Sequence, residues 1–350
     1  MNGRVVGLTL VLLFAACTRA GDPAERQDLG DGDHTPGSTV TGAPTSGTVP
    51  DPAGPDIYRV DPETGGSEEL LSSGEGGLDE PELSPDGKWL VFQGSAPDGT
   101  PQIFVLRHGI VDQLTDLPGG ALDPTWSPDG SQIAFAARHP SGDRSGWSFL
   151  DGYVGKTDIF VMDADGRHIR RLSGTPSPDR RPDWSPDGER IAFDGGAGIW
   201  VVTVPDGDLT PLPLKPITLA HGPAADPTWS PDGRWIAFTR FDPGTINGRN
   251  PYGVIWITRP DGRDESRLLP GESLQGSYAL DPSSSPDASS IAFSSGTASK
   301  IAIVDVRTGE IVHVDSVTDA TDLSWDGQGI LVSMGSLARP SPDPWPGGAG

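Results

Sequence analysis

The chain has 350 residues, among them 48 glycines and 36 prolines, and a formal net charge of −24. This glycine and proline content excludes a helical bundle or a coiled coil, because both residues break helices. Ten tryptophans and ten phenylalanines can still fill a core, so we expect an all-β protein of short strands and tight turns. A surface this negative repels phosphate backbones and argues against nucleic-acid binding.

Residues 1–17 are typical of a lipoprotein signal peptide. A short basic start precedes an apolar run, residues 5–16, which is too short to span a bilayer. The run ends in Phe-Ala-Ala-Cys, which resembles a bacterial lipobox. This resemblance implies that Cys17 is diacylated and becomes the mature N-terminus, whereas the alternative is an ordinary cleaved signal with an incidental cysteine. Since Cys17 is the only cysteine, we expect no intramolecular disulfide.

Two segments are expected not to fold. Residues 18–55 contain almost no large apolar side chain and are rich in Gly, Pro, Thr, Asp and Ala, which predicts a disordered tether. Residues 337–350 form a Pro/Gly-rich tail of similar composition. The folded domain is therefore expected to cover residues 56–336.

Within that domain one unit recurs six times. Its clearest copy is Asp-Pro-Thr-Trp-Ser-Pro-Asp-Gly at 123–130, followed by Ile-Ala-Phe at 133–135. The serines of the six copies, of which the last two are degenerate, are Ser84, Ser127, Ser185, Ser230, Ser285 and Ser324. Ser-Pro-Asp-Gly predicts a tight turn between two antiparallel strands, with glycine in the left-handed conformation. Strand-rich units that repeat every ~40 to 50 residues are typical of a β-propeller.

A second set of apolar strands accompanies these units. Five of them follow a Ser-Pro-Asp-Gly-type turn, and we expect them at 103–106, 159–162, 199–202, 254–257 and 301–304. A sixth, at 57–60, comes before the first turn. The chain therefore starts with the outer half of a blade and ends with the inner half. Pairing of residues 57–71 with 323–334 predicts a monomeric, six-bladed β-propeller closed by its own two ends.

These repeats resemble the WD40-like β-propeller repeats of the TolB family, which also occur in the propeller domains of prolyl-oligopeptidase-type peptidases. The resemblance covers residues 56 to about 336 and rests on the recurring Ser-Pro-Asp-Gly-x-x-Ile-Ala-Phe pattern. The TolB member of the family is a secreted component of the Tol-Pal envelope system and has an α/β domain before its propeller. Here the tether takes that place, so the resemblance implies the fold and not the Tol-Pal role itself.

One repeat position gathers charged residues. Four residues before the motif serines stand Glu80, Asp123, Arg181, Asp226, Asp281 and Ala320. Propeller geometry is expected to bring them together around one mouth of the central channel. They either hydrogen-bond adjacent blades and lock the ring, or bind a divalent cation or a basic partner group, with Arg181 offsetting one charge. The sequence identifies no metal-ligand set, and apart from such a cation we expect no cofactor.

Two long loops, residues 138–157 and 240–252, are expected on the same face. They contain aromatic residues close to arginines, and the residues of interest are Trp147, Phe149, Tyr153, Arg249 and Tyr252. Such loops suit recognition of a partner or a carbohydrate, and the alternative is that the aromatic rings pack beneath their own loops.

The chain has no Gly-x-Ser-x-Gly elbow, and its six histidines show no metal-site spacing. We therefore expect a lipid-anchored, extracytoplasmic binding scaffold and not an enzyme, with other envelope proteins, a small ligand or a glycan as partner. The alternatives are a carbohydrate- or peptide-processing lyase or hydrolase at the channel mouth, and a sensor domain for a membrane signalling protein.

The expected location depends on the source. Arginine outnumbers lysine by 21 to 4, which is typical of a high-GC bacterial genome. In a high-GC Gram-positive bacterium, the anchored protein would lie on the outer leaflet of the cell membrane. No membrane contact other than the lipid anchor is expected.

Overall fold

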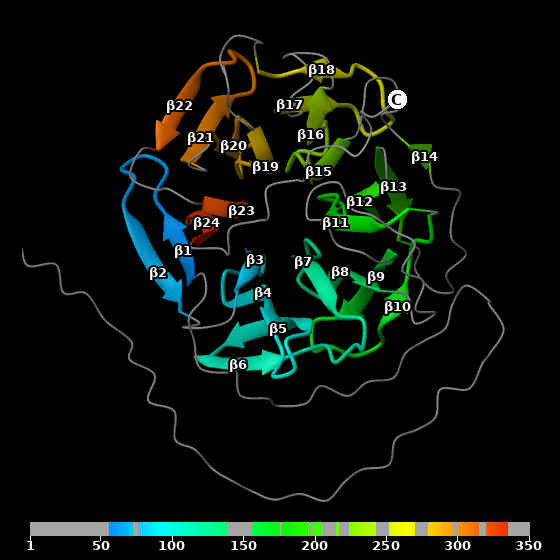
Figure 1. The fold of residues 1–350 in the computed structure, drawn as a ribbon. Coiled ribbons are helices and arrows are strands. Elements are labelled where there is room, and N and C mark those ends of the chain that lie inside the picture. Colours follow the sequence, from blue (N-terminus) through cyan, green and yellow to red (C-terminus); the bar gives the residue numbers. More distant parts are fainter. Residues whose placement is uncertain are drawn as a thin grey trace, which may run out of the picture. The chain divides into compact units, whose positions relative to one another are not determined.

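The computed structural model arranges the strands in six four-stranded antiparallel sheets around a central channel (Figure 1). The structure describes residues 56–72, 77–138, 156–175, 177–195, 198–204, 215–216, 224–242, 252–269, 279–296, 300–314 and 320–334. These residues form strands, turns and bends, with no helix among them. The all-β, six-bladed propeller predicted from the repeats is confirmed.

Each blade has the same strand order from the channel outward. The innermost strands are β3 (Asp79–Leu83), β7 (Ala121–Trp126), β11 (Asp179–Trp184), β15 (Ala224–Trp229), β19 (Ala279–Ser284) and β23 (Ala320–Asp326). The second strands are β4 (Trp89–Ser95), β8 (Gln132–Arg138), β12 (Arg190–Gly195), β16 (Ile236–Asp242), β20 (Ser290–Ser295) and β24 (Gly329–Met334).

The outer half of each blade holds the remaining strands. The third strands are β5 (Pro101–Arg107), β9 (Thr157–Asp163), β13 (Ile199–Thr203), β17 (Tyr252–Thr258), β21 (Lys300–Asp305) and β1 (Asp56–Val60). The outermost strands are β6 (Ile110–Gln113), β10 (Arg170–Arg171), β14 (Lys215–Pro216), β18 (Ser266–Arg267), β22 (Ile311–Val314) and β2 (Ser67–Leu71). Blades 1 to 5 run in chain order from β3–β6 to β19–β22, and blade 6 is the sheet β23-β24-β1-β2.

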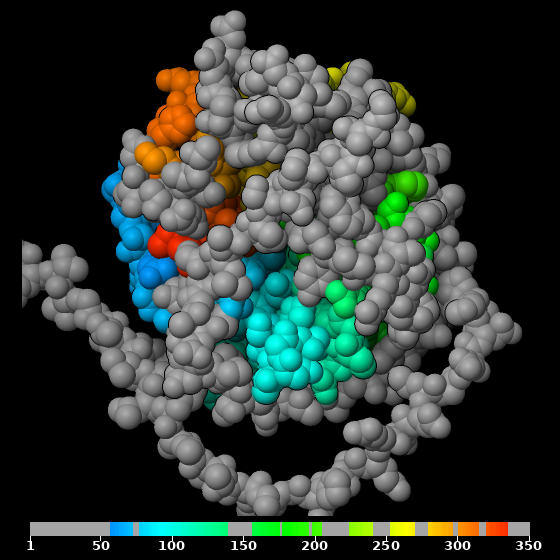
Figure 2. Space-filling model, viewed as in Figure 1, coloured from blue at the N-terminus to red at the C-terminus, as the bar shows by residue number. Residues whose placement is uncertain are grey.

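Blade 6 joins the two ends of the folded domain. Strand β1 pairs with β24 along its whole length, from Asp56 opposite Met334 to Val60 opposite Ile330. The blue N-terminal strands accordingly lie beside the orange and red C-terminal ones in Figure 2. Ile57 and Leu331 are both fully buried, so this closure is stabilised by apolar burial as well as by backbone hydrogen bonds.

The recurring turn is held by its serine and its aspartate. In blade 2, Ser127 Oγ donates to Asp129 Oδ1 at 2.7 Å and accepts from the backbone N–H of Gln132 at 2.9 Å. Gly130 has a φ of 70°, in the left-handed region that glycine adopts without steric cost. The serine donates to the aspartate in the same way in blades 1, 3, 4 and 5.

The core consists of the seams between neighbouring blades. Each Ile-Ala-Phe strand is apolar on both faces, and the phenylalanines are fully buried at Phe92, Phe135, Phe193, Phe238 and Phe293. The motif tryptophan packs against the preceding blade: Trp126 clusters with Val91 and Val105 of blade 1. One strand of each blade thus contributes to two seams, which explains its lack of alternation between apolar and polar residues.

Several predicted segments lie outside the described residues, namely the signal peptide 1–17 with Cys17, the tether 18–55 and the tail 337–350. Nothing in the structure tests them, and they stay predictions. Among the described residues, no helical segment has the length and apolar character needed to cross a bilayer.

The closure predicts how the fold responds to truncation. Deleting residues 1–75 removes β1 and β2, which leaves β24 with an unpaired edge and exposes the apolar seam residues beside it. We expect this variant to aggregate or to melt at a lower temperature than a variant lacking only residues 1–55, which retains all 24 strands. Thermal unfolding of the two purified variants tests this, and equal melting temperatures would contradict the role of blade 6 as the clasp.

Candidate functional site

Each innermost strand has an irregularity that turns one residue toward the channel. The strand register shifts at the same place in all six blades, as between Leu122 and Thr125 in blade 2. At each shift one residue has a φ between 50° and 53°, and these ring residues are Glu80, Asp123, Arg181, Asp226, Asp281 and Asp322. Left-handed backbone is unfavourable for residues other than glycine, so its recurrence at charged side chains marks this ring as the candidate site.

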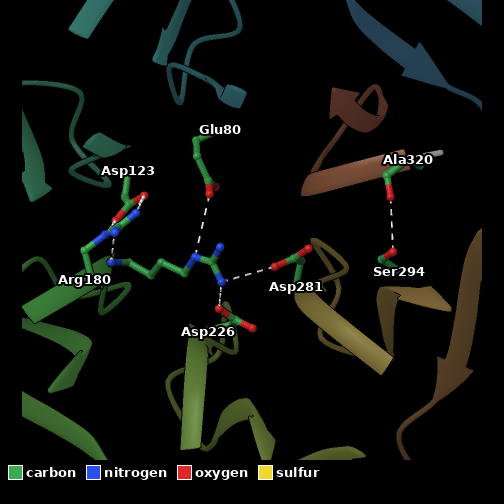
Figure 3. A network of polar contacts seen from close by, with 8 residues as sticks. Glu80, Asp123, Arg180, Asp226, Asp281, Ser294 and Ala320 are labelled. Carbon is green, nitrogen blue, oxygen red and sulfur yellow. Dashed lines mark hydrogen bonds and ion pairs between the residues drawn. The ribbon is translucent and has the colours of Figure 1, made fainter. Parts of the chain in front are cut away.

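The sixth ring residue differs from the one predicted. Aligning Ser324 with the motif serines placed Ala320 in the ring, and this alignment is wrong. Trp325 pairs with Ile330 as Trp126 pairs with Ile133, but the hairpin between them is shorter in blade 6. The true ring residue is therefore Asp322. Ala320 instead accepts a hydrogen bond on its carbonyl oxygen from Ser294 Oγ at 3.1 Å (Figure 3).

The ring residues line one cavity of about 280 Å³ that occupies the central channel and is bounded by all six blades. Five of the six blades place a proline directly after the ring residue, at Pro81, Pro124, Pro182, Pro227 and Pro282. Proline is tolerated there because the innermost strand is a sheet edge that faces the channel. The predicted gathering of Glu80, Asp123, Arg181, Asp226 and Asp281 at the channel is what the structure shows.

Arg181 crosses the channel and joins carboxylates from three other blades (Figure 3). Its Nη1 contacts Asp226 Oδ1 and lies 3.4 Å from Asp281 Oδ1, while its Nε lies 3.7 Å from Glu80 Oε1. Burial alone would lower the pKa of Arg181, but the surrounding acids, Asp281 first among them, raise it above its ordinary value. The guanidinium is therefore a permanent positive charge at the centre of the ring.

Asp123 has a cation of its own. Its carboxylate accepts from Arg180 Nε at 2.7 Å and from Arg180 Nη2 at 3.2 Å, in a bidentate ion pair between two buried side chains. It also accepts from the backbone N–H of Arg181 at 3.0 Å. Burial alone would raise the pKa of Asp123, but the charges and hydrogen bonds of Arg180 and Arg181 together outweigh burial and hold the pKa below its ordinary value.

At Glu80 the nearby positive charge does not make up for burial and for the repulsion from other acids. Burial in the channel and the neighbouring charge of Asp322 raise the pKa of Glu80 well above its ordinary value, although Arg181 acts in the opposite direction. Close carboxylates in a low-dielectric site cannot all ionise at no cost, so burial and mutual repulsion favour proton uptake at Glu80. The ring is thus acidic, with its charge balanced in part by two arginines.

A second set of polar residues links neighbouring blades at every other seam, and the sequence analysis missed it. Glu82, Asp183 and Ser283 lie two residues beyond the ring positions. Each accepts a hydrogen bond from the backbone N–H of a residue in the next blade: Glu82 from Trp126 at 2.9 Å, Asp183 from Trp229 at 2.5 Å, Ser283 from Trp325 at 2.8 Å. The signal was an acceptor side chain directly before the motif tryptophan or its equivalent. Burial raises the pKa of Glu82 to about 8 and that of Asp183 to about 7.

These contacts show that ring acids and linking residues do join adjacent blades, as one of the two interpretations held. One ring acceptor is open within the described part of the chain, because the buried Asp226 Oδ2 has no hydrogen-bond partner there. Among the residues that the structure describes, no group of three or more His, Cys, Asp and Glu side chains is placed to hold a metal ion. The channel is thus suited to recognising a positively charged group through oxygen acceptors.

Most of the predicted partner-loop residues cannot be placed. Trp147, Phe149, Tyr153 and Arg249 lie outside the described residues. Tyr252 is the first residue of β17 and pairs with Asp242 of β16.

The fold resembles solved propellers. A structure assigned to TolB from Agrobacterium tumefaciens superposes with a TM-score of 0.64 at 19% identity, covering 80% of this chain and 96% of that one. TolB from Acinetobacter baumannii gives a TM-score of 0.55 at 20% identity, covering 81% of this chain and 64% of that one. In fold, the chain is a TolB-like propeller. An oligogalacturonate lyase in complex with manganese also resembles it, with a TM-score of 0.51 at 16% identity over 87% of this chain and 80% of that one.

Sequence comparison reaches less far. No protein-family model matches the chain. An uncharacterised protein of Agrobacterium fabrum is 33% identical over 149 residues, which is 39% of this chain and 46% of that relative. The match therefore spans less than half of the relative's length. At these identities the likeness establishes the propeller fold and not an activity.

The central arginine predicts a pH-dependent loss of stability. Arg181→Gln leaves the ring acids without their shared cation, so we expect a loss of about 3 kcal/mol near pH 8, where the acids carry more charge than at lower pH. Removing the cation raises the folded-state pKa values of these acids. The deficit should therefore shrink as the pH falls toward about 5 and the acids take up protons.

Chemical denaturation of wild type and variant at both pH values measures this. Arg167→Gln, at an exposed side chain in a blade 2 turn, is the matched control and should change stability by less than about 0.5 kcal/mol. An Arg181→Gln deficit that is the same at both pH values would show that the guanidinium does not balance the ring charge.

Proposed function

We propose that the protein is an extracytoplasmic, lipid-anchored binding propeller that takes a basic group of an envelope partner protein into its acidic channel. The observation that carries the proposal is the channel cavity, which five ring acids line together with a single ring arginine, and whose lining residue Asp226 has a buried Oδ2 without a hydrogen-bond donor among the described residues. A buried carboxylate oxygen without a donor costs free energy, and an incoming ammonium or guanidinium group would recover it.

The charge of the channel supports the same proposal. Among the described residues that line the cavity, the five ring acids, Glu82 and Asp183 are acidic and Arg181 is basic, while Arg180 pairs with Asp123. A net negative, narrow channel concentrates its field and attracts positively charged groups of a partner. A basic side chain or a chain N-terminus fits this chemistry better than an acidic or neutral glycan.

We further propose that the protein is a binding module and not an enzyme. The ring side chains are engaged with each other and with neighbouring blades, and the described residues present no metal-ligand group of three or more side chains. The TolB-like fold supports a binding scaffold as well. The resemblance to a family with a secreted member supports the extracytoplasmic location. The oligogalacturonate lyase shares the fold alone, so an enzymatic role has no particular residue in this chain to support it.

The anchor proposal rests on Cys17, the only cysteine, at the end of a short apolar run. We expect Cys17→Ser to release the protein from membranes or to leave it unprocessed, because diacylation needs the thiol. Fractionation of cells that express each form, followed by detection of the protein in membrane and soluble fractions, measures this. A variant that is processed and fractionates as the wild type does would contradict the lipid anchor.

The channel proposal predicts which substitutions weaken partner binding. Asp226→Asn removes the open carboxylate, so we expect at least about tenfold weaker capture of partner protein from native membranes. Wild-type binding should weaken as salt is added, because the recognition is ionic. The matched control is Glu68→Gln, which makes the same charge change on the exposed outer strand β2.

Thermal unfolding of each variant first confirms that it is folded. Equal capture by Asp226→Asn and wild type would overturn the channel as the recognition site. Equal losses for Asp226→Asn and Glu68→Gln would show that net charge alone governs binding.

A further inference from the structure

A groove of about 530 Å³ lies at the hairpin end of blades 3 and 4, beyond the last residues of the inner strands. The start of β12, the turn between β15 and β16, and the turn between β17 and β18 contribute to it. Its lining residues are Arg190, Gly233, Arg234, Arg259, Pro260, Asp261, Arg263 and Asp264. Four arginines therefore converge on one hollow of a chain whose net charge is −24. Such a concentration of cations on an acidic protein is the feature to be explained.

Three of these guanidiniums are held only by loose ion pairs. Arg234 Nε lies 3.5 Å from Asp232, Arg259 Nε 3.4 Å from Asp264, and Arg263 Nε 3.1 Å from Asp261. None of the three contacts has the alignment of a hydrogen bond between described residues. All three side chains are more than half exposed, and exposed ion pairs of this kind contribute only about 0 to 1 kcal/mol.

The aspartates, in contrast, are parts of their turns. Asp232 Oδ1 accepts from Ser230 Oγ at 2.7 Å and from the backbone N–H of Arg234 at 3.0 Å. Asp261 Oδ1 accepts from the backbone N–H of Arg263 at 3.1 Å. The arginines can therefore change partner without disturbing the turns, while these two aspartates cannot.

Arg190 closes the groove on the side of blade 3. Its guanidinium carbon lies 4.8 Å from the ring centroid of Trp229, and its Nη2 donates to Asp187 Oδ2 at 3.2 Å. Stacking on the indole holds this guanidinium in place and reduces the entropy lost when it binds an anion.

Blade 2 shows that the fold does not require these arginines. Its turn Asp-Ala-Asp-Gly-Arg at 163–167 corresponds to Arg-Pro-Asp-Gly-Arg at 259–263 in blade 4. In blade 2 the first residue of the turn is Asp163, which pairs with His168 five residues later, with His168 Nδ1 2.6 Å from Asp163 Oδ2. In blade 4 the charges are exchanged, with Arg259 first and Asp264 at the position of His168. Ser131 of blade 2 likewise corresponds to Arg234.

We propose that this groove binds a small molecule that carries two or more phosphate or carboxylate groups. Guanidinium forks match the oxygen pairs of these groups, and three exposed arginines from two neighbouring turns line one hollow. A groove of this volume has room for more than one such group. The proposal is independent of the acidic channel, because the ring residues lie near the starts of the inner strands and the groove beyond their ends.

The test is calorimetric titration of the full chain with pyrophosphate and, separately, with citrate, in a background of constant chloride. We expect one-to-one binding of at least one probe, and the probe preferred identifies the phosphate or the carboxylate source. Arg259→Ala combined with Arg263→Ala should weaken that binding at least about tenfold, because each change removes charge-assisted hydrogen bonds. Thermal unfolding should be nearly unchanged, since both side chains are exposed.

The matched control is Arg167→Ala, at the position in blade 2 that corresponds to Arg263, and it should leave the affinity unchanged. Three results would overturn the proposal: no binding of either probe by the wild type, equal binding by the double variant, or an equal loss in Arg167→Ala. The last result would mean that the probes respond to total charge and not to this groove.

Discussion

The charge gathered in the central channel is the constraint on which this propeller depends. Six inner strands must approach one axis, and each turns a polar ring residue toward it, five of them acidic. Like charges so close together would force the blades apart unless they were compensated. Arg181 supplies the compensation from within the ring, by replacing one acid with a guanidinium that reaches three of the others. A single substitution in one repeat thereby turns a source of repulsion into a contact across blades.

Closure of the ring depends on two further kinds of contact that act at different radii. At the channel, Glu82, Asp183 and Ser283 hydrogen-bond the next blade at alternate seams. Farther out, the motif tryptophans and phenylalanines fill the seams with apolar surface. The hydrogen bonds fix the register of neighbouring blades, whereas apolar burial provides most of the stabilisation. The pairing of β1 with β24 then prevents blade 6 from presenting an open edge.

The sequence predicted the features that recur within each blade, but not the contacts between blades. Strand positions, the Gly130-type turns and the closure of blade 6 follow from local patterns, because turn chemistry and apolar runs act over a few residues. The ring was predicted in five blades for the same reason. It failed at Ala320, since the shorter last hairpin shifts the register and only strand pairing reveals Asp322. The role of Arg180 was missed, because its partner Asp123 belongs to another blade and no short-range pattern connects them.

In a repeat protein, equivalent positions of the repeats can be compared with one another. In this chain two positions that differ between blades, in the ring and in the groove, bear on the proposed binding sites. Residues shared by most blades, such as the turn serine and aspartate of blades 1 to 5, meet requirements of the repeated fold. A residue that one blade alone carries is not needed for a blade to fold, because the other blades fold without it. Arg181 stands where the five other blades have an acid, and Arg259 stands where blades 2, 5 and 6 have an aspartate. Each reverses the local charge of a structure that is otherwise repeated, and such positions are where a symmetric scaffold gains a particular ligand.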